Sequence, residues 1–158
     1  MSPNNTKKAT YSLKLLSILV CLGLGFFSGY FVKISDFSWY IGLNKPSFNP
    51  PSWVFGPVWA ILYVMIGLAA VNIFKGEKLY PKLLFVIQFI LNLLWSPLFF
   101  YLQRIGLALY DIVFLVISLA LLIYNIRNQR YTFSLLIPYF LWVSFAVILN
   151  YIIYVMNS

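Results

Sequence analysis

The chain has 158 residues, of which 63% are apolar and only 9% charged, and its mean hydropathy is +0.91. Soluble domains carry roughly a quarter charged residues, so this composition excludes a water-soluble globular enzyme and a disordered tail. The length suits one domain, residues 1–158, with five membrane spans of about 20 residues and short connections. We therefore predict an all-α integral membrane protein, a bundle of five transmembrane helices.

The inventory of reactive side chains is small. The chain contains no histidine, one cysteine at Cys21, and three acids, Asp36, Glu77 and Asp111. A disulfide framework, a Cys/His zinc site and a histidine-dependent triad are therefore excluded, and we expect no metal and no resident cofactor.

The net charge of +8 raises the question of nucleic-acid binding. The basic residues, however, lie in the gaps between apolar runs, where lysine and arginine contact lipid headgroups and set the topology. We therefore expect the lipid bilayer as a partner and no nucleic acid.

The first apolar run covers about residues 13–32 and follows a basic start, as in a signal peptide. Because it is about 20 residues long and no A-x-A cleavage site follows, we interpret it as a retained helix. The longest connection, Lys33 to Ser52, is rich in proline and aromatic residues, and Gln103 with Arg104 is expected to form a tight turn. The other helices are expected at about 53–74, 83–102, 105–126 and 131–156.

Three prolines, Pro57, Pro97 and Pro138, fall inside the expected helices. Each removes a backbone N–H and should bend its helix.

Lysine and arginine are distributed unevenly between the two sides of a five-span bundle. The side of the N-terminus carries eight, namely Lys7, Lys8, Lys14, Lys75, Lys78, Lys82, Arg127 and Arg130. The opposite side carries three, namely Lys33, Lys45 and Arg104. Since cytoplasmic segments are enriched in these residues, we predict a cytoplasmic N-terminus.

Three of the expected helices carry polar or aromatic side chains at helical spacing. On the second helix these are Phe55, Trp59 and Tyr63. On the third they are Gln88, Asn92, Trp95, Ser96 and Phe99, and on the fifth they are Pro138, Trp142, Ala146 and Asn150. Amides are costly in lipid, so these stripes should face the bundle interior. They fit either interhelical packing or the lining of a ligand cavity.

Asp111 is the one acid inside an expected span, and an intramembrane acid is a functional-site hypothesis by default. It lies about two turns from Arg104 on the same side of the fourth helix. The alternative is a structural residue near the membrane interface, hydrated or paired with Arg104.

Two further patterns are of low specificity. Cys21, Gly25 and Gly29 form a small-xxx-small pattern, which suggests a close helix contact and a possible dimer interface. The segment from Leu122 to Arg127, with Tyr124 between them, fits a loose sterol-contact pattern, although interface anchoring explains it equally well.

The segment from Trp39 to Tyr63 reads W-Y-I-G-L-N-K-P-S-F-N-P-P-S-W-V-F-G-P-V-W-A-I-L-Y. It closely resembles the signature of the translocator protein family (TspO/MBR), also called tryptophan-rich sensory proteins or peripheral benzodiazepine receptors. The similarity continues, in the same order and spacing, through the segments 88–100, 108–111 and 138–150.

The resemblance implies a five-helix bundle, often a homodimer, with a pocket beneath the first loop. Members of the family bind porphyrins, many bind isoquinoline carboxamide or benzodiazepine-type drugs, and some bind cholesterol. Carried over position by position, Tyr40 and Pro50 belong to a loop that covers the pocket. The implied lining residues are Phe55, Trp59, Tyr63, Asn92, Trp95, Trp142 and Ala146.

The sequence departs from animal members at two places. Their cholesterol-contact pattern needs a basic residue after a tyrosine near the end of the fifth helix, and none follows Tyr151. Phe48 occupies a loop position where relatives often carry tryptophan. A bacterial member, in the bacterial cell membrane, is therefore the simpler expectation.

Three functions remain open. The first is a membrane receptor or sensor for porphyrins, held without histidine ligation, whose propionates would meet Lys45 or Arg104 at the loop. The second is light-dependent porphyrin degradation, which the resemblance suggests because some bacterial relatives degrade protoporphyrin in light. Tryptophans equivalent to Trp59 and Trp142 are implicated there, so these two are the candidate catalytic residues. The third is a small-molecule transporter, against which stands the absence of a recognisable internal repeat.

Overall fold

The computed structural model describes residues 3–158, with side chains described from Lys8 onward. Lys7, one of the residues in the orientation count, lies in the first helix, but its side chain is outside the described part. The elements, in chain order, are α1 (Pro3–Ile34), α2 (Phe37–Gly42), α3 (Ser52–Lys75), α4 (Leu79–Ser96), η1 (Pro97–Tyr101), α5 (Ile105–Asn125) and α6 (Arg130–Asn157).

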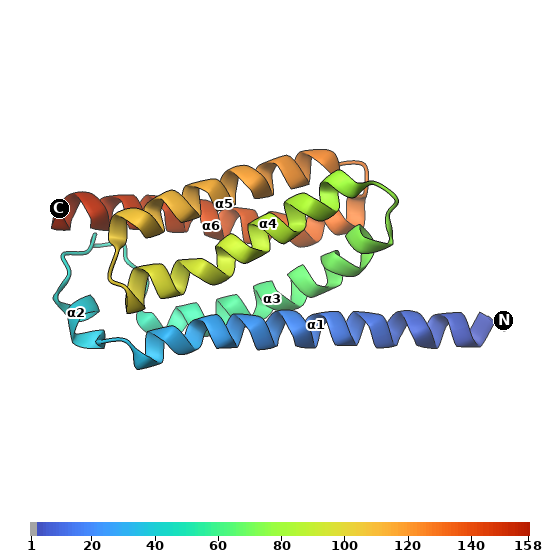
Figure 1. The fold of residues 1–158 in the computed structure, drawn as a ribbon, viewed down its shortest axis with the longest axis horizontal. Helices are drawn as coiled ribbons and strands as arrows, with labels where there is room; N and C mark the ends of the chain where they lie inside the picture. The colour runs from blue at the N-terminus through green and yellow to red at the C-terminus, as the bar shows by residue number, and fades with distance from the viewer. Residues whose placement is uncertain (1–2) are drawn as a thin grey trace.

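Within residues 3–158, five helices are long and apolar enough to cross a membrane, which confirms the predicted all-α bundle. The two ends of the chain lie at opposite ends of the bundle, as an odd number of spans requires (Figure 1). The main difference in bounds is at α1, which begins at Pro3 rather than near residue 13. The polar segment before the apolar run contains no helix breaker after Pro3, so the helix continues beyond the part that hydropathy detects.

The first connection contains a short helix, α2, that the sequence analysis did not predict. Asp36 caps it, since its Oδ1 accepts a hydrogen bond from the backbone N–H of Ser38 at 3.0 Å. An aspartate at this position satisfies an N–H that the helix itself leaves unpaired. In Figure 1, α2 lies across the end of the bundle that also holds the C-terminus.

The three prolines behave differently from one another. Pro57 and Pro138 lie inside α3 and α6, which continue through them. At Pro97, instead of a simple bend, α4 changes into the π-helical turn η1, closed by a 2.9 Å hydrogen bond from Leu102 N to Pro97 O. The predicted tight turn follows, with Gln103 at a positive φ of 54°.

The bundle is densely packed in the half far from α2. Ile66, Leu119, Leu122 and Leu136 are completely buried there. Helices α1 and α3 touch at backbone level in this half, because a Cβ added to Gly67 would lie 2.7 Å from the Cα of Ile18. The other half of the bundle, near α2, is the hollow one.

The small-residue pattern on α1 is used inside the chain. Cys21 and Gly25 are buried, and a Cβ at Gly25 would collide with the ring of Tyr63 on α3. The neighbouring Ser28 donates a 2.7 Å hydrogen bond to the carbonyl of Leu93 on α4. Cys21 and Gly25 therefore pack within the bundle of their own chain and leave no surface there for a dimer contact, whereas Gly29, the third residue of the pattern, is exposed.

Candidate functional site

A cavity of about 330 Å³ lies in the hollow half of the bundle, beneath α2. All five long helices contribute to its wall. Eight of the residues proposed for the site line it: Tyr40, Phe55, Trp59, Tyr63, Asn92, Trp95, Trp142 and Ala146. The ninth, Pro50, does not line it, and its neighbours Asn49 and Ser52 do.

The α3 side of the wall is a stack of aromatic rings. Trp59 stacks on Tyr63 with ring centroids 5.4 Å apart, and Trp59 meets the edge of Tyr139 at 6.2 Å. The Tyr63 hydroxyl donates a 2.8 Å hydrogen bond to Oδ1 of Asn92. This bond fixes the phenol and satisfies the amide oxygen, so the polar atoms of this wall are held in place.

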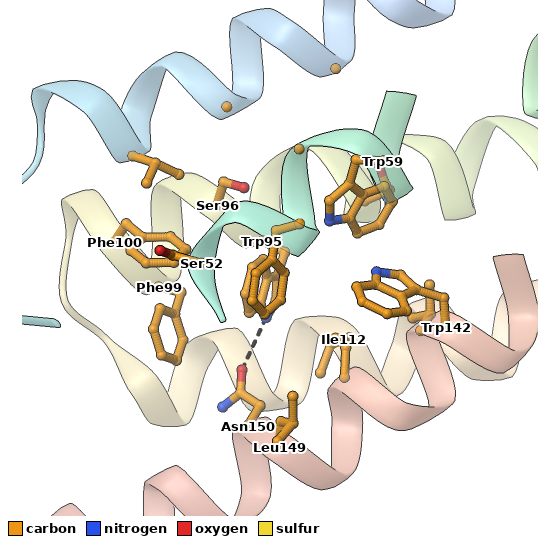
Figure 2. Close-up of a pocket in the computed structure, with 18 of the residues that line it drawn as sticks. Ser52, Trp59, Trp95, Ser96, Phe99, Phe100, Ile112, Trp142, Leu149 and Asn150 are labelled. Carbon is orange, nitrogen blue, oxygen red and sulfur yellow. Dashed lines mark hydrogen bonds between the residues drawn. The ribbon is translucent and has the colours of Figure 1, made fainter. Parts of the chain in front are cut away.

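The opposite wall is organised by Asn150. Its Oδ1 accepts a 3.0 Å hydrogen bond from the indole of Trp95 (Figure 2). Its Nδ2 donates to the carbonyl of Ile105 at 3.2 Å. One buried amide thus joins α4, α6 and the start of α5. The predicted inward direction of Asn150 is confirmed, and Trp95 is held in one orientation.

The π-helical turn shapes the end of the cavity nearest α2. Phe99 and Phe100 are consecutive in η1, yet both line the cavity, with ring centroids 4.9 Å apart. A wider helical turn changes the register of side chains relative to the preceding α-helix, and such turns are frequent at functional sites. Trp95 stacks on Phe99 at 5.1 Å, which continues the aromatic lining from α4 into η1.

Trp142 forms a wall between two spaces. On its inner side it lines the cavity and meets Phe55 edge-on at 5.8 Å. On its outer side it lines a shallow apolar groove between α3 and α6, together with Ile61 and Leu141. Pro138, expected on the inner stripe, is exposed and lines this outer groove instead.

Gln88 belongs to the packed floor beneath the cavity. It is completely buried, its Oε1 accepts a 2.8 Å hydrogen bond from the hydroxyl of Tyr139, and its Nε2 donates to the carbonyl of Phe85. For this member of the α4 stripe, the packing interpretation is correct.

The loop over the cavity is fixed by Lys45. Its ammonium group donates to the carbonyls of Tyr40, Ile41 and Leu43, and it lies 4.6 Å from the centre of the Tyr40 ring. An ammonium has three donors, so all of them are used. In this structure Lys45 therefore has no donor left over for the ligand carboxylate that it was expected to meet. Arg104 is exposed and does not line the cavity.

A second contact, which we call the clasp, joins the same loop to the end of α6. Oδ1 of Asn157 accepts a 2.9 Å hydrogen bond from Asn44 N, and its Nδ2 donates to Asn44 O at 2.9 Å. The amide side chain thereby pairs with both backbone groups of one loop residue. No local sequence pattern could have revealed the clasp, because its partners are 113 positions apart.

Asp111 is buried in α5, and its Oδ2 has no hydrogen-bond partner among the described residues. It does not line the cavity, whereas its neighbour Ile112 does. With Asp111 buried and Arg104 exposed, the expectation of a hydrated interfacial residue is wrong.

In the sterol-contact pattern, Leu122 faces the core while Tyr124 is exposed. The guanidinium of Arg127 lies 4.2 Å from the Tyr124 ring centre and donates to the carbonyl of Tyr124. These contacts fit interface anchoring at the end of α5.

Two parts of the cavity wall were missed by the sequence analysis. Helix α1 contributes Gly25, Phe26, Gly29 and Val32, and α5 contributes Ile112 and Leu115. These are glycines, aliphatic residues and one phenylalanine in apolar runs, so no polar marker distinguishes them from residues in contact with lipid. The spacing of Gly25 and Gly29 on one helix face could have indicated this part of the wall, but from the sequence it was interpreted as a dimer contact.

The cavity is suited to binding a flat apolar molecule. Among the described residues that line it, none is charged, and its polar groups are amides, hydroxyls and indole N–H groups. Aromatic walls with a few fixed polar groups are typical of sites for aromatic ligands.

Residues 17–156 match the family model described as "TspO/MBR family". The chain belongs to the TspO/MBR family. It is 42% identical to the tryptophan-rich protein TspO of Archaeoglobus fulgidus over 92% of this chain and 98% of the relative. It is 40% identical to the protein of the same name from Chlorobaculum tepidum, over 90% of this chain and 94% of the relative.

Animal members of the TspO/MBR family are also similar. The translocator protein of Homo sapiens is 34% identical over 83% of this chain and 82% of its own length. Together with the five apolar helices, these relatives show that the chain is an integral, multi-pass membrane protein of the translocator and sensory type.

Proposed function

We propose that the chain is a membrane receptor or sensor that binds porphyrins and drug-like aromatic ligands in the cavity beneath α2. The observation that carries this proposal is the uncharged wall that contains three indoles, those of Trp59, Trp95 and Trp142. Flat macrocycles gain from ring stacking and from burial of apolar area. Metal-free porphyrin and haem should compete on similar terms, because no histidine is present to ligate iron.

The orientation of the ligand follows from where the polar groups lie. Asn49 and Ser52 line the cavity from the loop side, whereas the amide oxygens deeper in the walls, those of Asn92 and Asn150, already accept hydrogen bonds from Tyr63 and Trp95. The carboxylates of a porphyrin should therefore lie toward the loop, because a charged group at the bundle centre is costly.

The test is a titration of the purified protein with protoporphyrin in the dark, followed by quenching of tryptophan fluorescence. Ala146→Phe places a ring inside the cavity and should weaken binding by at least about tenfold, or roughly 1.4 kcal/mol. Leu141→Phe, on the same helix but in the outer groove, is the matched control and should bind as the wild type does. Equal affinities for the two variants would refute the location of the site.

Light-dependent porphyrin degradation is the second candidate, and the positions of two indoles favour it. Trp59 and Trp142 both line the cavity, and Trp59 lies beside Tyr63 and Tyr139. On excitation, an indole can transfer one electron to the porphyrin, and the reduced porphyrin passes that electron to dioxygen to give superoxide. The indole radical cation then takes one electron back from the porphyrin, and the resulting porphyrin radical cation combines with superoxide to give an oxygenated product.

Replacing both Trp59 and Trp142 with Phe tests this role. Phe preserves most of the apolar volume but is much harder to oxidise, so product yield under light should fall more than dark affinity does. An unchanged product yield would exclude electron donation by these indoles.

A transporter is the alternative function. Saturable, gradient-driven uptake of porphyrin into liposomes would favour it over the receptor.

We also propose a bacterial cell membrane as the location, a cytoplasmic N-terminus and a homodimer. A reporter fused after Ser158 should then be active only outside the cytoplasm, and light scattering should give twice the mass of one chain.

A further inference from the structure

The cavity wall includes residues that are also on the outer surface of the bundle. Phe26 of α1 is 67% exposed and still lines the cavity. Gly29 of α1 and Gly56 of α3 also line it and are exposed. A cavity whose lining is exposed on the side of the bundle opens sideways, toward the surface that lipid covers.

The opening lies between α1 and α3. The two helices run in opposite directions (Figure 1) and touch at Gly67 and Ile18, where an added Cβ would be 2.7 Å from a backbone atom. Moving eleven residues along each helix from that contact brings Gly29 opposite Gly56. There, an added Cβ on either glycine meets nothing within 4 Å. The two levels are about 16 Å apart along the helix axes, at a rise of 1.5 Å per residue, and over this distance α1 and α3 separate from each other.

The other flank of α1 is closed at this level. Ser28 is hydrogen-bonded to the carbonyl of Leu93 on α4 at 2.7 Å. The rings of Phe31 and Tyr101 meet with centroids 5.6 Å apart. The gap between α1 and α3, which we call the slot, is therefore confined to one side of α1.

The aqueous end of the cavity is covered by the fixed loop. Lys45 uses its three donors on backbone carbonyls of the loop, and the clasp holds Asn44 to Asn157 through two 2.9 Å hydrogen bonds. These contacts would all have to rearrange for a ligand to pass through the loop. Among the residues whose side chains are described, none forms a hydrogen bond across the slot, so no such bond has to break there.

The depth of the slot indicates which molecules can use it. Gly56 lies four residues inside the start of α3 and Gly29 five residues inside the end of α1, or about 6–8 Å along each axis. This level corresponds to the boundary between headgroups and hydrocarbon in the leaflet on the α2 side. A flat amphiphile resting at that boundary has its carboxylates among the headgroups and its ring at the slot.

We infer that the cavity is loaded from the bilayer: a carboxylate-bearing flat aromatic amphiphile, dissolved in the leaflet on the α2 side, passes between α1 and α3 at Gly29 and Gly56 while the loop stays closed. This inference rests on the proposed function, since it concerns the route to the same cavity. It identifies the ligand class as molecules that partition into lipid before they bind.

Two leucine substitutions test the slot. Gly56→Leu and Gly29→Leu each place a bulky side chain in the gap, at positions where an added Cβ has open space and where leucine favours the helix. The control is Gly23→Leu, because Gly23 is also exposed on α1 with no atom near its Cβ but does not line the cavity. Asn157→Ala, which removes the clasp, tests the route through the loop.

The measurement uses protein in lipid nanodiscs, kept dark, with protoporphyrin as the probe and tryptophan quenching as the signal. Gly56→Leu and Gly29→Leu should each lower both the association rate and the dissociation rate by about tenfold. A lower dissociation rate is the decisive sign of a narrowed passage, because loss of cavity volume alone would raise it. Gly23→Leu and Asn157→Ala should stay within about twofold of the wild type.

The outcomes separate the possible failures. Rates for Gly56→Leu and Gly29→Leu equal to those of Gly23→Leu would overturn access through the slot. Faster exchange in Asn157→Ala, with no change in the slot variants, would show that ligands pass through the loop. A wild-type protein that shows no quenching would overturn the proposed function itself, and with it the ligand class.

Discussion

The contact between α1 and α3 at Gly67 provides a sharp test of the packing described above. Gly67→Ala would place a Cβ 2.7 Å from Ile18 Cα, 2.9 Å from Ile18 N and 3.1 Å from Ser17 O, whereas ordinary contact begins at 3.4 Å. Helix α1 must therefore move away by about 0.7 Å. The movement also strains the 2.8 Å hydrogen bond from Ser17 Oγ to Gly67 O.

The expected change in unfolding free energy is the sum of opposing effects. Overpacking costs about 1–3 kcal/mol, and loss of an interhelical hydrogen bond in a membrane costs about 0.6 kcal/mol. Replacing glycine by alanine in a helix gains about 1 kcal/mol. Gly67→Ala should therefore be destabilised by about 0.6–2.6 kcal/mol relative to the wild type.

The matched control is Gly23→Ala on the free face of α1, where an added Cβ meets nothing within 4 Å. It should be neutral or stabilised by up to about 1 kcal/mol, so the two variants should differ by about 0.6–3.6 kcal/mol. The assay is reversible unfolding in mixed detergent micelles, followed by circular dichroism. Equal unfolding free energies for the two variants would refute backbone-level contact between α1 and α3.

Three further predictions concern Asp111, Asp36 and Asn157. Asp111→Asn should change protoporphyrin affinity by less than about tenfold, because Asp111 does not line the cavity, and a complete loss of binding at unchanged stability would contradict this. Hydrogen bonds from Ser38 hold the pKa of Asp36 below its usual value. The cap that Asp36 forms therefore stabilises α2 above about pH 4, and this stabilisation is lost as the pH falls through the folded-state pKa. Asp36→Asn should remove this pH dependence from the amide exchange of α2, after correction for intrinsic rates. Asn157→Ala should accelerate exchange of the Asn44 amide while leaving the amides of α3 unchanged, and equal protection of Asn44 in both proteins would show that the clasp is absent in solution.

The sequence was sufficient for the number of spans because each apolar run is long enough to cross a bilayer. It was also sufficient for most inward-facing residues: Trp95 and Asn150 are found hydrogen-bonded to each other, as amides that avoid lipid should be. Helix α2 could have been predicted, since Asp36 is a favourable N-cap and Gly42 ends the helix, but proline and aromatic residues nearby suggested an irregular loop.

Other features depend on contacts that no local pattern encodes. To predict the π-helical turn at Pro97, one would have to know how α4 meets the turn that follows it. The finding that Phe99 and Phe100 both line the cavity was therefore not foreseen. Gly25 could face another chain or its own bundle with the same spacing, and only the position of Tyr63 decides between them. The direction in which Lys45 points is likewise set by the carbonyls exposed at the end of α2.

The clasp has a consequence for the order in which the protein is assembled. Asn44 is synthesised 113 residues before Asn157, so the loop cannot be fixed to the bundle until α6 has been translated and inserted. The same helix supplies Trp142 and Asn150 to the cavity wall. A nascent chain that has inserted only α1 to α5 therefore has neither a complete wall nor a fastened loop, and ligand binding becomes available only with the final insertion step during biosynthesis.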